Sequence, residues 1–425
     1  MAPSRKRQKQ LSPDEAGGVK INRTLEFEQW LEIHNGSLPK SMEIRSFDCI
    51  GNGVFTHTEI VDTILEIPLS IVLSEDKVAA SAEGRAFDKV VASPLSPRGK
   101  FYCFLIAQRN QTTSFFGPYL RSLPLQYTTP FYWSPEELQW LEGTTLRNTV
   151  QSTLSSLTDE FNAYFPLLSD AFPELFASVK FEDYLWAHCT YTSRGFPAQV
   201  GNSTGTLGCL LPVVDLLNHR HLTPIEWNTT DSKIVIKHCG KTSIAGNQQV
   251  FNNYGAKSNG EFLLGYGFCL ENNFDHDRVV VTVGISTQDP LYTPKMKALE
   301  GLERQCILNA LQISSELQQV MRIAVMDESE LQQLQLNPQS SLEYINVENE
   351  LNMMESLEQL ISHSLQKNSL VQIRDESTNA QNAMLYRNGQ QHIFEMYLNK
   401  LLPEYRQQVI LQHAEEFAPY LEEHF

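Results

Sequence analysis

The chain has 425 residues, a formal net charge of −17 and an ordinary apolar content of 41%. This length predicts more than one domain. The negative charge argues against nucleic acid as a partner, because proteins that bind nucleic acids present basic surfaces. It favours a basic protein partner, although solubility alone is an equally good explanation of the charge.

Neither a membrane span nor a secretory signal is expected, since no run of 18 apolar residues occurs and the N-terminus lacks an apolar segment. The seven cysteines form no CxxC pair, so neither a disulfide framework nor a zinc or other metal site is indicated. These features fit a reducing compartment, the cytoplasm or the nucleus. The basic cluster Arg5-Lys6-Arg7-Gln8-Lys9 is either a nuclear localisation signal or part of a disordered basic tail over residues 1–20.

The first helix is predicted at Phe27 to Ile33, with Phe27, Trp30, Leu31 and Ile33 on or near one face. Short apolar segments separated by glycine turns follow between residues 44 and 73. They predict compact sheets of small strands rather than a parallel βαβ array.

Residues 85 to about 190 are helical in pattern and rich in aromatic side chains. A buried helix is predicted at 101–107, and Ser134-Pro135 has the pattern of a helix start, with an N-cap followed by proline. A further helix is predicted at 181–189. Strand patterns return at 208–214, 234–236 and 250–251, so a β domain with a helical insertion is the natural interpretation.

A strand at 278–283 precedes the C-terminal part of the chain. Apolar residues at three- and four-residue spacing then predict helices over 295–326, 342–366 and 380–422. Stretches rich in Gln, Asn and Ser near 332–341 and 366–382 are interpreted as loops between these helices.

Two segments carry polar residues in an order typical of an active site. The first is Leu211-Pro212-Val213-Val214-Asp215-Leu216-Leu217-Asn218-His219, and the second runs about 35 residues further on, from Asn253-Tyr254-Gly255 to Tyr266-Gly267-Phe268. Taken singly, Asn218, His219 and Tyr254 are better explained as satisfied core residues. Their order after Gly51-Asn52-Gly53 and Arg194 resembles that of a known family, and this resemblance implies a functional role.

Together the two segments resemble the halves of a SET-domain methyltransferase active site, in the subtype typified by the Rubisco large-subunit lysine methyltransferase. Three further stretches resemble signatures of this family, and the resemblance covers about residues 25 to 400. Ile50 stands where many relatives carry an acidic residue. The three stretches are Phe116-Gly117-Pro118-Tyr119-Leu120-Arg121-Ser122-Leu123-Pro124 (with Phe116 in place of Trp), Phe181 to Arg194, and Tyr386-Arg387-Asn388-Gly389-Gln390.

The resemblance implies an α+β fold: a SET β-fold with knot-like threading, interrupted by a helical insertion and followed by an α-helical domain. The implied boundaries are a tail at 1–20, a SET domain at 21–285 with its insertion at about 85–190, and a helical substrate-binding domain at 286–425. The threading would bring Tyr254 beside Asn218 and His219.

The resemblance also implies the roles of the site residues. S-adenosylmethionine would be held by Gly51, Asn52, Arg194, Asn218, His219 and Tyr266. Tyr254 would be catalytic, orienting the acceptor nitrogen and the transferring methyl group. Phe196 and Phe268 would line the channel for the acceptor side chain, and Asp215 would either contact the substrate or cap its local turn.

The function implied is methylation of a lysine on a non-histone protein, with a ribosomal protein as a candidate substrate, by a monomeric enzyme of a fungus or another eukaryote. Two alternatives remain open: a catalytically silent SET scaffold that binds a protein partner, and a histidine N-methyltransferase. Phe196, two residues after Arg194, resembles the lysine-modifying members, whereas histidine-modifying relatives are more polar there.

Overall fold

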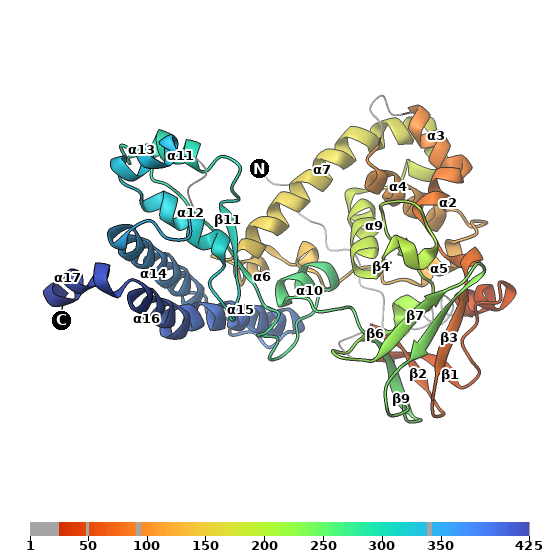
Figure 1. Cartoon of the computed structure of the whole chain (residues 1–425). Helices are drawn as coiled ribbons and strands as arrows, with labels where there is room; N and C mark the ends of the chain where they lie inside the picture. Colours follow the sequence, from red (N-terminus) through yellow and green to blue (C-terminus); the bar gives the residue numbers. More distant parts are fainter. Residues whose placement is uncertain (1–24, 48–50, 91–94, 338–341, 425) are drawn as a thin grey trace. The chain divides into compact units, whose positions relative to one another are not determined.

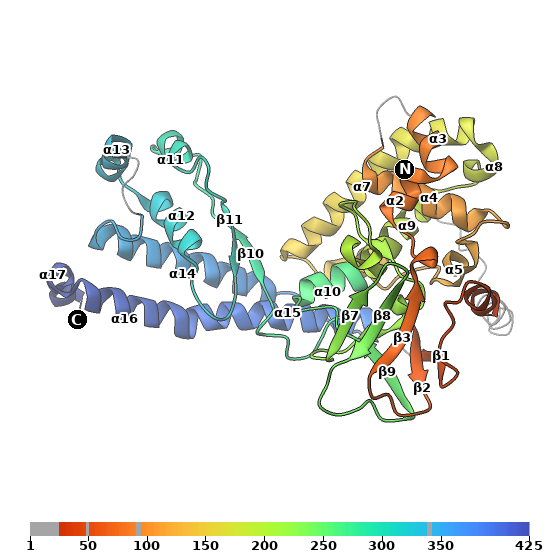
Figure 2. The same cartoon turned by 45° about the vertical axis from the view of Figure 1, so that its right-hand side comes forward.

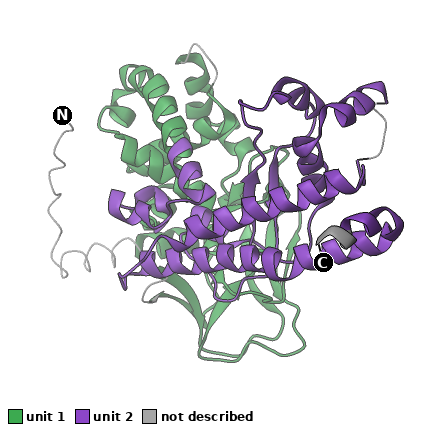
Figure 3. Cartoon of the chain, turned by 90° about the vertical axis from the view of Figure 1, so that its left-hand side faces the viewer, with its two compact units in different colours: residues 1–127, 153–255 green, residues 128–152, 256–425 purple. Residues whose placement is uncertain are grey.

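The computed structural model describes residues 25–47, 51–90, 95–337 and 342–424. The predicted tail, its basic cluster and Ile50 lie outside these ranges. Two compact units are present (Figure 3): unit 1 comprises residues 1–127 and 153–255, and unit 2 comprises 128–152 and 256–425. The predicted domain boundary near residue 285 stays a prediction.

Among its described residues unit 1 contains three sheets; the two larger ones lie together at one end of the unit, whereas β4 of the third lies among helices (Figure 1). In the four-stranded sheet β1-β2-β9-β6, only the β9–β6 pairing is parallel. The other two sheets are β3-β8-β7 and β4-β5, both antiparallel. The strands are β1 (Met42–Phe47), β2 (Gly51–Thr56), β3 (Thr63–Pro68), β4 (Gly195–Phe196), β5 (Cys209–Leu210), β6 (Asn218–His219), β7 (Ile225–Thr229), β8 (Lys233–His238) and β9 (Gln248–Asn252).

The predicted helical insertion is confirmed between β3 and β4, and α4 is its central helix. Every residue of α4 from Phe101 to Gln108 is buried, as the apolar run predicted. The helices are α2 (Glu75–Ala80), α3 (Ala82–Val90), α4 (Pro97–Asn110), α5 (Gly117–Ser122), α6 (Pro135–Gln139), α7 (Thr145–Ala171), α8 (Pro173–Phe176) and α9 (Phe181–Arg194), with short 3-10 turns η1 (Leu69–Ile71), η2 (Pro130–Tyr132), η3 (Ala198–Gly201) and η4 (Val214–Leu216).

Part of this insertion belongs to unit 2. Residues 128–152 pack there because Trp133, Leu141 and Leu146 share a buried cluster with Leu263 and Tyr386. The predicted helix start at Ser134 is confirmed, and Ser134 and Glu137 form a capping box.

Unit 2 is mostly helical, and α15 continues through a π-helical turn, η5, into α16 (Figure 2). Its elements are α10 (Asn259–Tyr266), β10 (Val279–Thr282), α11 (Tyr292–Ala298), β11 (Gln305–Leu308), α12 (Ser315–Val325), α13 (Glu328–Leu336), α14 (Val347–Ser369), α15 (Thr378–Met396), η5 (Tyr397–Leu401), α16 (Leu402–Gln412) and α17 (Ala414–His424). Within the described ranges, none of the helices combines the length and the apolarity that a membrane crossing requires.

The signature Tyr386-Arg387-Asn388-Gly389-Gln390 serves the packing of unit 2. It lies in α15, where Arg387 donates to the carbonyl oxygens of Trp140 and Glu142 at 2.9 and 3.0 Å, and Gln390 donates to that of Arg278 at 2.8 Å. These side chains are buried, so they stabilise the unit by satisfying backbone acceptors rather than by presenting groups to a partner.

Three sequence predictions were wrong. Ile33 is 74% exposed, because it lies six residues beyond Phe27 and so points away from the buried face of Phe27, Trp30 and Leu31. The run 295–326 is not one helix, since Gln305–Leu308 pairs with β10 and buries alternate side chains. The predicted loop near 332–341 overlaps helix α13, whose start is capped by Asp327 and Glu330.

Candidate functional site

The segment from Val213 to His219 is the hub of the candidate site. It comprises the 3-10 turn η4 and strand β6, and it is entered through a strained backbone: buried Val213 has φ 74° and ψ −47°. A β-branched residue rarely adopts positive φ, and such strain persists only where the surrounding structure fixes it. Strand β6 pairs with β9 through Asn218–Phe251 and His219–Asn252.

Tyr254 is held against this hub by three contacts. Its backbone N–H donates to Nδ1 of His219 at 3.0 Å, its hydroxyl donates to the carbonyl oxygen of Leu217 at 3.0 Å, and its ring stacks on the His219 ring with centroids 5.1 Å apart. The predicted proximity of Tyr254 to the Asn218–His219 strand is therefore confirmed. Because both ends of the tyrosine are bonded, its hydroxyl has a fixed position.

Burial lowers the pKa of His219 to about 4, and the neighbouring His221 contributes in the same direction. The ring is therefore neutral at physiological pH, and Nδ1 is the acceptor because it receives the Tyr254 N–H. Through this hydrogen bond, His219 holds the backbone of Tyr254 in position.

Arg194, the last residue of α9, meets Asp215 of η4. Its Nη1 donates to the carboxylate oxygen Oδ2 at 3.0 Å and to the main-chain oxygen of Asp215 at 2.9 Å. The Asp215 side chain has no exposed surface and that of Arg194 is 14% exposed. Burial raises the pKa of the Asp215 carboxyl, with Arg194 opposing the shift. Burial also lowers the pKa of Arg194, but the carboxylate outweighs this and the net pKa is raised, so the guanidinium stays charged.

Tyr119 completes this pair, a role that sequence reasoning missed. Its hydroxyl, fully buried in α5, donates to Oδ2 of Asp215 at 2.9 Å. The tyrosine belongs to the Pro118-Tyr119-Leu120 signature, which was the available signal, but the motif alone does not identify its partner. The structure thus shows Asp215 holding Arg194 in position, and the two roles predicted for Asp215, capping its turn and contacting the substrate, stay predictions.

The glycine-rich turn reaches the hub through β2. Asn218 donates from its side-chain amide to the carbonyl oxygen of Asn52 at 3.4 Å. Gly51 has φ 76°, and no atom lies within 4 Å of the position a Cβ would take. The predicted need for glycine is thus confirmed, and the backbone there is open to close approach.

The remaining predicted residues belong to other elements of the fold. Phe196 is buried in β4 and packs on Trp227 of β7, with centroids 5.0 Å apart. Tyr266 and Phe268 belong to unit 2, where both rings pack with Phe262. Burial raises the pKa of the Tyr266 hydroxyl. Their predicted roles at the cofactor and the channel stay predictions.

Comparison with known proteins gives three kinds of match. Residues 286–394 match the family described as Rubisco LSMT substrate-binding. The chain is 32% identical over 208 residues to the protein-lysine N-methyltransferase EFM1 of Saccharomyces cerevisiae, covering 40% of this chain and 36% of the relative. It is 27% identical over 315 residues to the actin-histidine N-methyltransferase of Gallus gallus, covering 70% of this chain and 52% of that protein. The match thus spans about half the length of the actin-histidine N-methyltransferase and about a third of EFM1.

Solved structures agree on the fold. The SET domain of LSMT bound to lysine and AdoHcy superposes with a TM-score of 0.75 at 20% identity, covering 95% of this chain and 99% of that chain. Rubisco LSMT bound to AdoMet superposes with a TM-score of 0.74 at 21% identity, covering 92% and 93%. The predicted fold class, a SET fold with a helical C-terminal domain, is confirmed. The chain has the architecture of the SET-fold proteins that carry a Rubisco LSMT substrate-binding domain.

Proposed function

We propose that this protein is an S-adenosylmethionine-dependent methyltransferase that modifies a lysine side chain of a non-histone protein, with a ribosomal protein as the candidate substrate, and that it acts as a monomer in the cytoplasm or the nucleus. The observation that carries the proposal is the double attachment of Tyr254 to the hub, through His219 and Leu217. A tyrosine hydroxyl fixed in this way is suited to orienting a reacting group.

The residues present fit S-adenosylmethionine, the cofactor named with the matched structure of Rubisco LSMT. Among the described residues, Nε of Arg194, Oδ1 of Asp215 and Nδ2 of Asn252 are buried without a hydrogen-bond partner. A native structure rarely leaves such atoms unsatisfied. The amino-acid end of the cofactor offers a carboxylate for the donors and an ammonium for the acceptor, and Gly51 leaves room for a close approach.

The cofactor would supply a methyl group on a positively charged sulfur, open to attack by a neutral amine. Tyr254 would contribute by orienting the reacting groups. Its hydroxyl donates its hydrogen to the carbonyl oxygen of Leu217, so towards an N–H of the attacking nitrogen the oxygen can act only as a hydrogen-bond acceptor. His219 is neutral at physiological pH, so its Nδ1 can accept the backbone N–H of Tyr254 and hold this tyrosine in place.

Lysine is preferred over histidine as the acceptor for two reasons. The relative with the highest identity quoted above is named a lysine methyltransferase, and the apolar Phe196 lies two residues after Arg194. Histidine is the second candidate, because the actin-histidine relatives align over a larger part of this chain. The class of the modified residue is thus what an experiment has to determine first.

The test is incubation of the full-length protein with cell lysate and isotope-labelled S-adenosylmethionine, followed by mass spectrometry of the labelled protein. Tyr254→Phe keeps the ring and should lower turnover about 10²- to 10³-fold, by analogy with the loss of one positioned hydrogen-bonding group. Tyr164→Phe, a half-buried tyrosine of α7 in the same unit, is the matched control and should leave turnover unchanged.

The outcomes separate the candidates. Label on lysine supports the proposal, and label on histidine replaces it with the second candidate. Cofactor binding by calorimetry without any transferred label would indicate a silent scaffold. Near-normal turnover of Tyr254→Phe would remove Tyr254 from the transfer step.

A further inference from the structure

A hollow in unit 2 lies beside α16, and none of its lining residues in the part of the chain that the structure describes is a lysine or an arginine. Its volume is about 630 Å³, within the range of about 300–1,000 Å³ typical of ligand sites. Its charged groups are the carboxylates of Glu343 and Glu404. The lining residues are Leu311, Gln312, Ile313, Gln318, Glu343, Tyr344, Leu401, Glu404, Tyr405, Gln408, Val409, Gln412 and His413.

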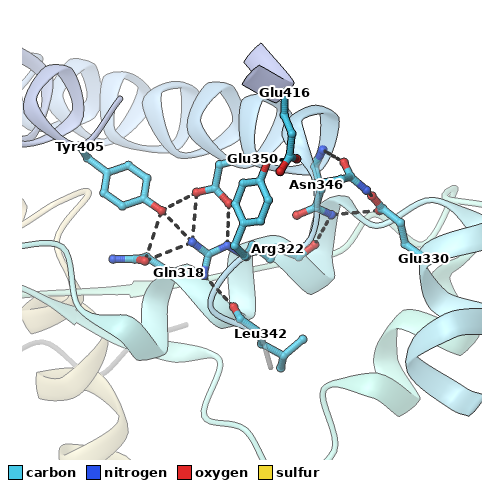
Figure 4. Close-up of polar contacts among 10 residues, drawn as sticks. Gln318, Arg322, Glu330, Leu342, Asn346, Glu350, Tyr405 and Glu416 are labelled. Atoms are coloured by element: carbon cyan, nitrogen blue, oxygen red, sulfur yellow. Dashed lines mark hydrogen bonds and ion pairs between the residues drawn. The ribbon is translucent and has the colours of Figure 1, made fainter. Parts of the chain in front are cut away.

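Two lining residues of the hollow, Gln318 and Tyr405, bond a buried arginine whose charge is already neutralised. Arg322 of α12 binds Glu350 of α14 in a bidentate ion pair at 2.8 and 3.0 Å, and its side chain is 2% exposed (Figure 4). It also donates to the hydroxyl of Tyr405 at 2.7 Å and to the carbonyl oxygen of Leu342 at 2.7 Å. The cation therefore adds no net positive charge to the hollow, and Glu343 and Glu404 determine its sign.

The same network fixes the walls. Arg322 and its partners join α12, α14, α16 and the segment before α14 at one point. At the rim, Tyr344 stacks on His413 with centroids 3.7 Å apart and donates its hydroxyl to Glu416 at 2.9 Å, which adds a third carboxylate nearby. A hollow with fixed walls loses little conformational entropy when a ligand binds.

The lining suits a cationic peptide segment. Carboxylates pair with lysine or arginine heads, the glutamine amides can bond a peptide backbone, and Leu311, Ile313 and Val409 offer apolar contact for the long side-chain stems. Leu311 is 67% exposed, so apolar surface is available at the edge. The chain's charge of −17 would also attract a basic partner.

We propose that this hollow docks a lysine- or arginine-bearing segment of the protein substrate, apart from the residue that is methylated. The proposal rests on the proposed function for the identity of the partner. The six lining residues from Leu311 to Tyr344 belong to the stretch that matches the Rubisco LSMT substrate-binding family, and the other seven lie beyond it, in η5, α16 and His413.

The test measures binding independently of catalysis. A fluorescein-labelled peptide of alternating Arg, Lys, Gly and Ser is titrated with the full-length protein, and fluorescence anisotropy reports the Kd. The double variant Glu343→Gln/Glu404→Gln should weaken binding about tenfold, as expected for the loss of two ion pairs at a partly exposed site. Glu300→Gln/Glu303→Gln removes the same charge from exposed positions of unit 2 outside the hollow, and should change the Kd less than about twofold.

Equal weakening by both double variants would overturn the proposal, because it would indicate general attraction to an acidic protein. An unchanged Kd in the hollow variant, or preference for an acidic peptide of the same length, would overturn it as well. In the methylation assay, the hollow variant should raise KM for the intact protein substrate and leave kcat unchanged. If the protein binds the peptide through Glu343 and Glu404 but transfers no methyl group, the docking proposal stands and the proposed enzyme function is refuted.

Discussion

Replacing Asp215 by asparagine should destabilise unit 1 and weaken cofactor binding at the same time. The change keeps the shape of the side chain and removes its charge, which leaves the buried Arg194 guanidinium without its counter-ion. Breaking a buried pair by removing one partner typically costs about 3–5 kcal/mol. At the observed 3.0 Å, the attraction itself is about 5 kcal/mol for an effective dielectric constant near 20.

The lower end of this range is expected, because one contact survives. Nη1 of Arg194 also donates to the main-chain oxygen of Asp215 at 2.9 Å, and the substitution leaves that oxygen in place. A cost of about 3 kcal/mol corresponds to an increase of about 10²-fold in the opening constant of the segment. Hydrogen exchange of peptides from α9 and from residues 213–219 measures this opening directly.

Glu350→Gln provides the matched control. It makes the same carboxylate-to-amide change at a buried arginine pair, but in unit 2. Exchange in α14 should rise by a similar factor, while the affinity for S-adenosylmethionine measured by calorimetry should fall only in Asp215→Asn. If Asp215→Asn costs less than about 1 kcal/mol, or if both variants lose cofactor affinity equally, the assignment of the Arg194–Asp215 pair to the cofactor site is wrong.

Three further outcomes are expected. Arg194→Ala should weaken S-adenosylmethionine binding about tenfold or more by calorimetry, since a charge-assisted bond to a buried carboxylate is lost; equal affinity would remove Arg194 from the site. Tyr119→Phe should destabilise unit 1 by about 1.5–3 kcal/mol, because a hydrogen bond to a charged group is lost. Tyr102→Phe changes another buried tyrosine, which is bonded to His188, and should leave the affinity for S-adenosylmethionine intact. Because the pKa of folded His219 is depressed from 6.5 to about 4, its stabilising contribution is present above pH 6.5 and lost as the pH falls toward 4; His219→Asn should make this loss shallower, and an unchanged pH dependence would contradict the buried, neutral ring.

The sequence predicted the elements best where one physical signal dominated. The apolar run at 101–107 gave a buried helix, and Ser134 with Pro135 gave a helix start, because capping chemistry is local. Strand β11 was missed because a four-residue strand and a helix segment share a short apolar run, and its pairing partner β10 lies more than 20 residues away. The assignment of residues 128–152 to unit 2 depends on long-range packing that no local pattern carries.

In the candidate site, too, some features could be predicted from the sequence and others depend on long-range packing. The glycine at position 51 and the proximity of Tyr254 to His219 follow from motifs whose order is visible in the sequence. The bond from Tyr119 to Asp215 joins residues 96 positions apart, and neither periodicity nor propensity encodes it. The motif marked Tyr119 as unusual, but only the fold identifies its partner.

Arg194 and Arg322 differ in how completely their guanidinium nitrogens are bonded within the protein. Both pair with a carboxylate that has no exposed side-chain surface. Arg322 bonds through Nε, Nη1 and Nη2 to protein partners, which is the arrangement expected of a group that holds a fold together. Arg194 uses Nη1 for its bonds to Asp215 and leaves Nε buried without a partner, as does Asp215 at Oδ1. Leaving a buried charged group partly unsatisfied costs stability, and in the function we propose the cofactor completes these bonds.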